Sequence, residues 1–110
     1  MEITTRDHKR ASVVRIVGRV DSNTSQEFDA KLKEYISTNR VHLVIEMDQT
    51  DYLSSAGVRA LISAQKAVKT KGGKVVLSSP SEKVRDVLKL AALESLFPIY
   101  DTTEDAVGAV

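Results

Sequence analysis

Short β-branched runs alternate with helix-forming segments along most of this chain, and this alternation limits the folds open to it. Such runs occur at residues 13–18, 41–47 and 74–77, with weaker ones at residues 3–5 and 97–100. Strands separated by helices favour a parallel sheet, whereas the turn at residues 7–10 predicts an opening antiparallel hairpin. We therefore expect one α/β domain over residues 1–110, with a mostly parallel sheet and an antiparallel edge strand.

The helices are indicated by capping residues and by apolar residues at helical spacing. Thr24 and Glu27 have the spacing of a capping box, which predicts a helix beginning near Thr24. A second helix is predicted over residues 55–71, where a Gly-Gly pair ends it. A third is predicted from the Ser/Glu pair within residues 79–82, with the proline in its first turn, and a terminal one over residues 102–110.

Composition and charge exclude several classes of function. The 110 residues carry a net charge of +1 and no tryptophan, so we expect no direct nucleic-acid binding. The chain has no cysteine, which fits a reducing cytosol. Its first residues lack an apolar signal core, and no apolar run approaches the ~20 residues that cross a bilayer. We expect a cytoplasmic protein without membrane association.

No catalytic or metal-binding constellation can be assembled from the sequence. His8 lies in the first predicted turn. His42 lies on an apolar strand, where a histidine is more often packed in the sheet than used as a catalytic base. Neither histidine has partners at metal-ligand spacing, and no base or oxyanion hole can be named for a nucleophilic serine. The sequence predicts a protein that is not an enzyme and that has neither a metal nor a cofactor.

Two polar loops follow predicted strands and are the candidate functional segments. One covers residues 18–24 and the other residues 48–57. Ligands of open α/β sheets gather at the carboxyl ends of the strands. If the strands are neighbours and their crossovers are right-handed, the two loops lie side by side.

Ser55 is the candidate functional residue of the second loop. It is predicted at a helix N-terminus, where free amides and the helix dipole favour negative charge, and Ala56 and Gly57 leave room for an approaching kinase. The alternative is that Ser54 and Ser55 only cap the helix, because serine is among the best N-cap residues. The residues by themselves favour the capping interpretation.

The aspartates of these loops also have two interpretations. Asp21 is either a cap of the first helix or a carboxylate that faces Ser55 across a groove, and Asp48 and Asp51 are most simply solvated turn residues. If Asp21 faces Ser55, phosphorylation places roughly −2 of charge beside a carboxylate and repels an acidic partner surface.

Four segments in a fixed order resemble one known family. Residues 46–61, with Ser54, Ser55, Ala56, Gly57 and Val58 at their centre, resemble the phosphorylation motif of bacterial anti-sigma factor antagonists of the STAS-domain family. Residues 18–24 are similar to the family's Gly-x-hydrophobic-Asp-x-x-Thr loop, and residues 72–77 and 93–101 match in character and order.

The resemblance implies a single STAS domain over residues 1–110, with four or five strands and helices mainly on one face of the sheet. It also implies partner switching. The unphosphorylated protein binds an anti-sigma factor that is also a serine kinase and so frees a sigma factor. The kinase phosphorylates its inhibitor with ATP, and a metal-dependent phosphatase of the PP2C type restores binding. In the implied cycle the antagonist is a substrate, and we expect it to be a monomer.

The family's site residues fall on numbered positions of this chain. Ser55 matches the phosphoacceptor, Asp21 and Thr24 match groove residues of the neighbouring loop, and Ala56, Gly57 and Val58 match the start of the contact helix. Ser54 stands where the commonest motif has aspartate, which makes it a competing acceptor, and Arg59 stands where many members have glycine. The alternative function is a STAS scaffold of a signalling complex that is not regulated by phosphorylation.

Overall fold

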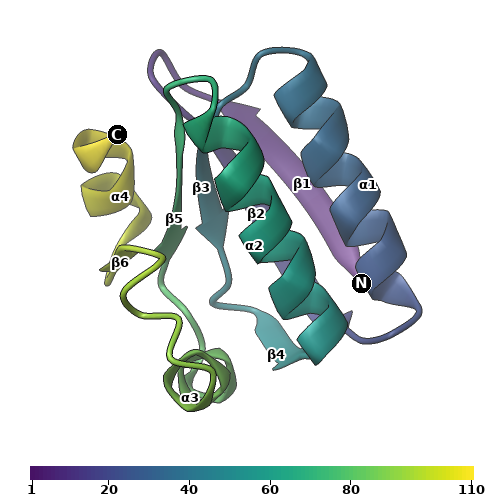
Figure 1. Ribbon diagram of the computed structural model, residues 1–110. Coiled ribbons are helices and arrows are strands. Elements are labelled where there is room, and N and C mark those ends of the chain that lie inside the picture. The colour runs from purple at the N-terminus through teal and green to yellow at the C-terminus, as the bar shows by residue number, and fades with distance from the viewer.

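A mixed sheet of six strands forms the centre of the molecule, and helices pack on both of its faces (Figure 1). The computed structural model describes all residues, 1–110. The elements follow in the order β1 (Glu2–Asp7), β2 (Ser12–Val20), α1 (Thr24–Ser37), β3 (His42–Glu46), β4 (Thr50–Leu53), α2 (Ser55–Lys69), β5 (Lys74–Ser78), α3 (Glu82–Leu90), β6 (Ile99–Tyr100) and α4 (Thr103–Ala109). The predicted α/β class is confirmed.

Strand β2 is the spine of the sheet because it has partners on both sides. The strand order is β1-β2-β3-β5-β6, with β4 also beside β2. β1 runs antiparallel to β2, whereas β3, β4, β5 and β6 all join the sheet in parallel. The first part of β2 pairs with β3 and its last part with β4, with a register shift between Gly18 and Arg19. β3 and β4 therefore follow one another along the same side of β2.

The sequence did not predict β4, whose residues we expected in a loop, so the sheet has six strands where four or five were expected. The segment has only four residues, and Asp51 and Tyr52 are exposed, which leaves no apolar run to recognise. It becomes a strand through tertiary pairing with β2. The buried hydroxyl of Thr50 strengthens this pairing by donating a hydrogen bond of 2.8 Å to the carbonyl oxygen of Ile16.

The core is divided unequally between the two faces of the sheet. The larger cluster lies between the sheet and helices α1, α2 and α3, with Phe28, Leu61 and Leu88 among its members. The smaller cluster lies on the opposite face, where Val44 of β3 meets Ala106 of α4. Helices α1 and α2 lie side by side across the larger face (Figure 1). The prediction that the helices pack mainly on one face is confirmed, with α4 as the exception.

Two helix starts differ in detail from the predictions. α1 begins at Thr24 as expected. The predicted Thr24–Glu27 capping box is wrong, because the Asp21 carboxylate accepts the amide hydrogens of Asn23 and Thr24 instead. α3 begins at Glu82, and the hydroxyl of its N-cap Ser81 accepts the Val84 amide hydrogen at 3.3 Å. Pro80 therefore lies before the helix and not in its first turn.

A buried glutamine fixes α2 to β5. The side chain of Gln65 is 1% exposed, accepts the amide hydrogen of Val75 at 2.8 Å and donates to the carbonyl oxygens of Val75 and Leu96, each at 2.9 Å. β6 has two residues and pairs only with Leu77 and Ser78, so it does not reach Val75. The amide group of Gln65 therefore replaces the bonds that a longer β6 would make.

Candidate functional site

The two candidate loops meet at the carboxyl edge of β2 and β4. Val20 pairs with Leu53 in the β2–β4 ladder, and the amide of Ser54 donates a hydrogen bond of 2.8 Å to the carbonyl oxygen of Val20. The chain enters α1 shortly after Val20 and enters α2 directly after Ser54. The prediction that the loops lie side by side is confirmed, and β4 is the element that brings them together.

The two serines at the start of α2 have different environments. Ser54 is the N-cap residue and is half-buried, and its hydroxyl oxygen accepts the amide hydrogen of Gly57 at 3.2 Å. Ser55 is the first residue of the helix, is exposed and makes no side-chain hydrogen bond. The capping interpretation therefore applies to Ser54, while the hydroxyl of Ser55 is free to react.

The start of α2 rests directly on the two strands. Gly57 is buried, and a Cβ atom at this position would lie 2.7 Å from Cδ1 of Leu53 and 2.8 Å from Cγ1 of Val20. Only glycine allows this approach without displacing those side chains. Val58 is buried in the core and Ala56 is half-buried. Gly57 and Val58 thus set the position of Ser55, while Ala56 is partly exposed to solvent.

Asp21 and Thr24 form a compact turn before α1. The Asp21 carboxylate accepts the amide hydrogens of Asn23 and Thr24, each at 2.9 Å, and the Thr24 hydroxyl donates to the carbonyl oxygen of Arg19 at 2.7 Å. The hydrogen bond from the Thr24 amide, followed by that from Asn23, lowers the pKa of Asp21 below its usual value of 3.8. Asp21 accepts these amide hydrogens from two residues before the N-cap position, which is Asn23, and no hydrogen bond joins Asp21 to Ser55.

An arginine and a tyrosine stack beside these loops, and the sequence did not single them out. Arg19 and Tyr52 are partners in the β2–β4 register, and the Arg19 guanidinium lies 4.4 Å from the centroid of the Tyr52 ring. Tyr52 is 41% exposed although it is a large side chain. Their pairing follows from β4, so a sequence without a recognisable β4 gave no signal for it.

A groove between α1 and α2 opens next to the start of α2. Its volume is about 300 Å³, and its lining residues are Ser25, Gln26, Asp29, Ala56, Arg59, Ala60 and Ser63. Asp29 is paired with Lys33 at 2.7 Å, whereas Arg59 is exposed and takes part in no salt bridge or side-chain hydrogen bond. The groove therefore carries one unengaged positive charge.

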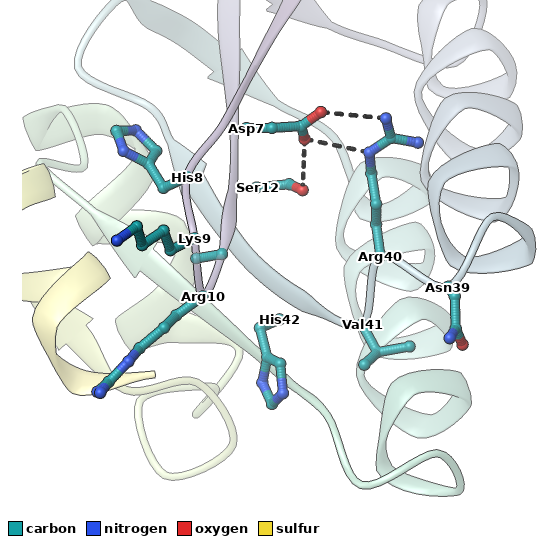
Figure 2. Close-up of a pocket in the computed structure, with 10 residues that line it drawn as sticks. Asp7, His8, Lys9, Arg10, Ser12, Asn39, Arg40, Val41 and His42 are labelled. Atoms are coloured by element: carbon teal, nitrogen blue, oxygen red, sulfur yellow. Dashed lines mark hydrogen bonds and ion pairs between the residues drawn. The ribbon is translucent and has the colours of Figure 1, made fainter.

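A second pocket lies at the opposite end of β2 and β3, near the β1–β2 turn (Figure 2). Arg40 holds the Asp7 carboxylate through two hydrogen bonds of 3.1 Å, and the Ser12 hydroxyl donates to the same carboxylate at 2.8 Å. Arg40 first, and then Ser12, lowers the pKa of Asp7 below 3.8. In Figure 2 the side chains of Lys9 and Arg10 point away from this pair and do not converge on a common point. The Asp7–Arg40 pair in this pocket thus holds the end of β1 against the segment that leads into β3.

The site offers a free serine hydroxyl and no cluster of metal ligands. No group of three histidine, cysteine, aspartate or glutamate side chains is placed to hold a metal ion. His42 begins β3, and its Nδ1 is buried without a hydrogen-bond partner. No helix has the length and apolar character required to span a membrane. The reactive group that the site presents to solvent is the hydroxyl of Ser55, which makes no hydrogen bond.

Comparisons with known proteins agree on one family. The family model described as the STAS domain matches residues 2–106. The anti-sigma F factor antagonist of Paenibacillus polymyxa is 24% identical over 108 residues, covering 97% of this chain and 92% of that protein. The anti-sigma-F factor antagonist RsfB of Mycobacterium tuberculosis is 26% identical over 110 residues, covering 98% and 88%. An anti-sigma factor antagonist from Mycobacterium paratuberculosis, solved as a crystal structure, is similar with a TM-score of 0.91 at 25% identity, covering 99% of this chain and 92% of that one.

Proposed function

The chain belongs to the STAS domain family, and from this we propose that it is an anti-sigma factor antagonist whose binding is abolished by phosphorylation of Ser55. Both sequence relatives named above carry the antagonist function in their names, and the match extends over nearly their whole length. The protein acts as a binding protein and not as an enzyme. Its partner is an anti-sigma factor.

The regulatory cycle that we propose has two states. Unphosphorylated protein, as a monomer in the cytoplasm, binds an anti-sigma factor that is also a serine kinase, and a sigma factor is released. The kinase transfers the γ-phosphoryl group of ATP to the Ser55 hydroxyl oxygen, with ADP as the second product, and the phosphorylated antagonist dissociates. A metal-dependent phosphatase of the PP2C type hydrolyses the phosphomonoester and restores binding.

The free hydroxyl of Ser55 is the observation that carries this proposal. Phosphoryl transfer requires a hydroxyl that a kinase can reach, and Ser55 is exposed and unbonded at the first residue of α2. Ser54 is the weaker acceptor because its hydroxyl caps the helix and is half-buried. Phosphorylation of Ser54 would replace the cap, whereas phosphorylation of Ser55 leaves the cap in place.

The effect of the phosphate follows from charge and position. A phosphoserine carries roughly −1.5 to −2 of charge at pH 7. At the N-terminus of α2 this charge is tolerated by the helix dipole, so the fold is retained. The neighbouring Asp21 is also negatively charged at neutral pH, and its hydrogen bonds, which lower its pKa, favour this ionised form further. An acidic partner surface at this edge is then repelled by the phosphate, and an apolar partner surface loses its contact there.

The partner surface that we propose surrounds Ser55. Its exposed or half-exposed residues include Ser54, Ala56, Asp21 and Thr24, and we add the stacked pair Arg19 and Tyr52. Tyrosine and arginine are the residue types that most often dominate binding energy at protein interfaces. Gly57 and Val58 are buried and contribute by holding the start of α2 against Val20 and Leu53.

A kinase assay with mapped products tests the proposal. The protein is incubated with candidate anti-sigma kinases and ATP, and phosphate is located by mass spectrometry. We expect phosphate on Ser55 in the wild type and in Ser54→Ala, and none on Ser55→Ala. Phosphate on Ser54 alone would overturn the residue assignment.

Binding measurements test the switch itself. Ser55→Ala is expected to bind the kinase as the wild type does, whereas Ser55→Asp is expected to bind much more weakly. Equal binding by the two variants would exclude the switch. A stable large assembly in size-exclusion chromatography, with no phosphorylation by any candidate kinase, would favour the scaffold function instead.

A further inference from the structure

Arg59 lies one helical turn beyond Ser55 on α2 and has no partner in the unphosphorylated protein. Residues four apart in a helix lie on the same face, with Cβ atoms roughly 5–6 Å apart. Long side chains of helical residues lean toward the N-terminus of their helix, which for Arg59 is the direction of Ser55. The guanidinium can therefore reach a group attached to the Ser55 oxygen.

The surroundings of Arg59 offer it no acid that lacks a partner. The residues three and four positions away along α2 are Ser55, Ala56, Ile62 and Ser63, none of which is charged. Across the groove, α1 contributes Asp29, but Lys33 already holds that carboxylate at 2.7 Å. Arg59 is thus an exposed guanidinium without a counter-ion, placed where only a modified Ser55 would provide one on its own helix.

We propose that Arg59 is the internal counter-ion of phosphorylated Ser55 and holds the phosphate against α2 at the mouth of the α1–α2 groove. This inference rests on the proposed phosphorylation of Ser55. A phosphate followed by arginine four residues later has the favourable order for a helical ion pair, because negative charge lies toward the N-terminus. Guanidinium is also suited to phosphate, since it presents parallel N–H donors to two oxygens.

The pair fixes the charge state and the direction of the phosphate. The second ionisation of a phosphoserine has a pKa near 6, so a nearby cation favours the dianion and raises its share around neutral pH. Arg59 is a positioning residue in this arrangement, because it acts on the modification and not on the transfer of the phosphoryl group.

The phosphate pKa measures the pairing directly. Phosphoserine is installed at position 55 during synthesis, independently of any kinase, and the ³¹P chemical shift is followed between pH 4 and 9. We expect Arg59→Gln to raise the phosphate pKa by about 0.2–0.4 pH units, as a helical ion pair of ordinary strength would. Arg59→Lys is expected to retain part of the effect, since it keeps the charge but not the planar donor pair.

Lys66→Gln is the matched control. Lys66 is exposed on the same helix, takes part in no salt bridge and lies eleven residues beyond Ser55, roughly 16 Å along the axis. We expect this variant to leave the phosphate pKa unchanged within 0.1 pH units, because the distance exceeds the Debye length at physiological salt, about 8 Å. Equal shifts in Arg59→Gln and Lys66→Gln would overturn the proposal, because they would reflect only the overall charge.

Salt provides the second criterion. A direct but exposed ion pair weakens with ionic strength, so the difference between wild type and Arg59→Gln is expected to shrink at 1 M NaCl. No effect of Arg59→Gln at low salt, or an effect that 1 M NaCl leaves intact, would exclude the counter-ion role. Because the phosphate is installed without a kinase, the pairing can be found even if the kinase assay yields no phosphate on Ser55, and the two failures are thus distinguishable.

Discussion

Replacing Gln65 by leucine removes one of the few polar side chains of the core while keeping a side chain of similar volume. In the wild type, its amide group hydrogen-bonds the Val75 amide, the Val75 carbonyl and the Leu96 carbonyl. The variant leaves these backbone groups without partners, because β6 is too short to reach Val75 and the side chain of position 65 is only 1% exposed to water. The substitution therefore removes the hydrogen-bond partners of three backbone groups as well as the glutamine amide itself.

The magnitude follows from the number of bonds lost. Each hydrogen bond contributes about 1 kcal/mol net, and a buried group left unsatisfied costs about 1–3 kcal/mol. The added apolar burial of leucine offsets on the order of 1 kcal/mol. We expect Gln65→Leu to lower the free energy of unfolding by about 2–4 kcal/mol, a large part of the roughly 5–15 kcal/mol that stabilises a domain.

Urea denaturation followed by far-UV circular dichroism measures this change. Gln26→Leu is the matched control, because Gln26 is exposed on α1 and makes no side-chain hydrogen bond, and we expect it to change the free energy by less than about 0.5 kcal/mol. A loss below about 1 kcal/mol in Gln65→Leu, with an unchanged denaturant slope, would refute the role of Gln65 as a substitute for a longer β6.

Other properties of the site can be tested separately. Ser54→Ala is expected to lower the free energy of unfolding by about 1 kcal/mol, because the N-cap hydrogen bond from the Gly57 amide is lost. Ser55→Ala is expected to change it by less than about 0.5 kcal/mol. A larger loss for Ser55→Ala than for Ser54→Ala in urea denaturation would contradict the assignment of Ser54 as the cap. The hydrogen bonds that lower the pKa of Asp21 stabilise the fold fully above its usual pKa of 3.8, and this stabilisation is lost as the pH falls through the lower folded value. Between pH 5 and pH 2 the unfolding free energy of Asp21→Asn should therefore fall less than that of the wild type. An equal acid dependence of the two proteins would contradict this. If the proposed anti-sigma kinase is the partner, Tyr52→Ala is expected to weaken its binding at least tenfold in calorimetry. Leu90→Ala, which removes the other large exposed apolar side chain, should have no effect. Similar losses in both variants would argue against a specific surface at Tyr52.

Much of the architecture could be predicted because it depends on local patterns. The apolar runs of β2, β3 and β5 and the helical spacing of Phe28, Leu32 and Ile36 identify their elements without tertiary information. Glycine after the last turn of α2 and serine before α3 likewise act within a few residues of their own position. Local signals of this kind also indicated that both candidate loops follow strands.

The remaining features depend on contacts between distant segments. Residues 50–53 form a strand only because β2 extends past β3 and offers free backbone groups to them. The stacking of Arg19 on Tyr52 depends on that register, so it had no signal in the sequence. The difference between Ser54 and Ser55 depends on where α2 begins to within one residue, which a capping motif with two adjacent serines does not define. That Ser55 is the phosphoacceptor stays a prediction.

The double pairing of β2 has a consequence for how the molecule moves. β2 pairs with strands on both sides over residues 12–15 and contributes to the core on both faces of the sheet. Backbone groups with this protection exchange their amide hydrogens only in the rarest opening events, which approach global unfolding. The edge that carries Ser55 is joined to the far end of the same strand, through the hydrogen bond from the Ser54 amide to Val20 and the β2–β4 pairing. If Ser55 is phosphorylated as proposed, we expect the added charge to change the electrostatics of this edge more than its backbone shape, because the edge is hydrogen-bonded to a strand whose first half is paired on both sides.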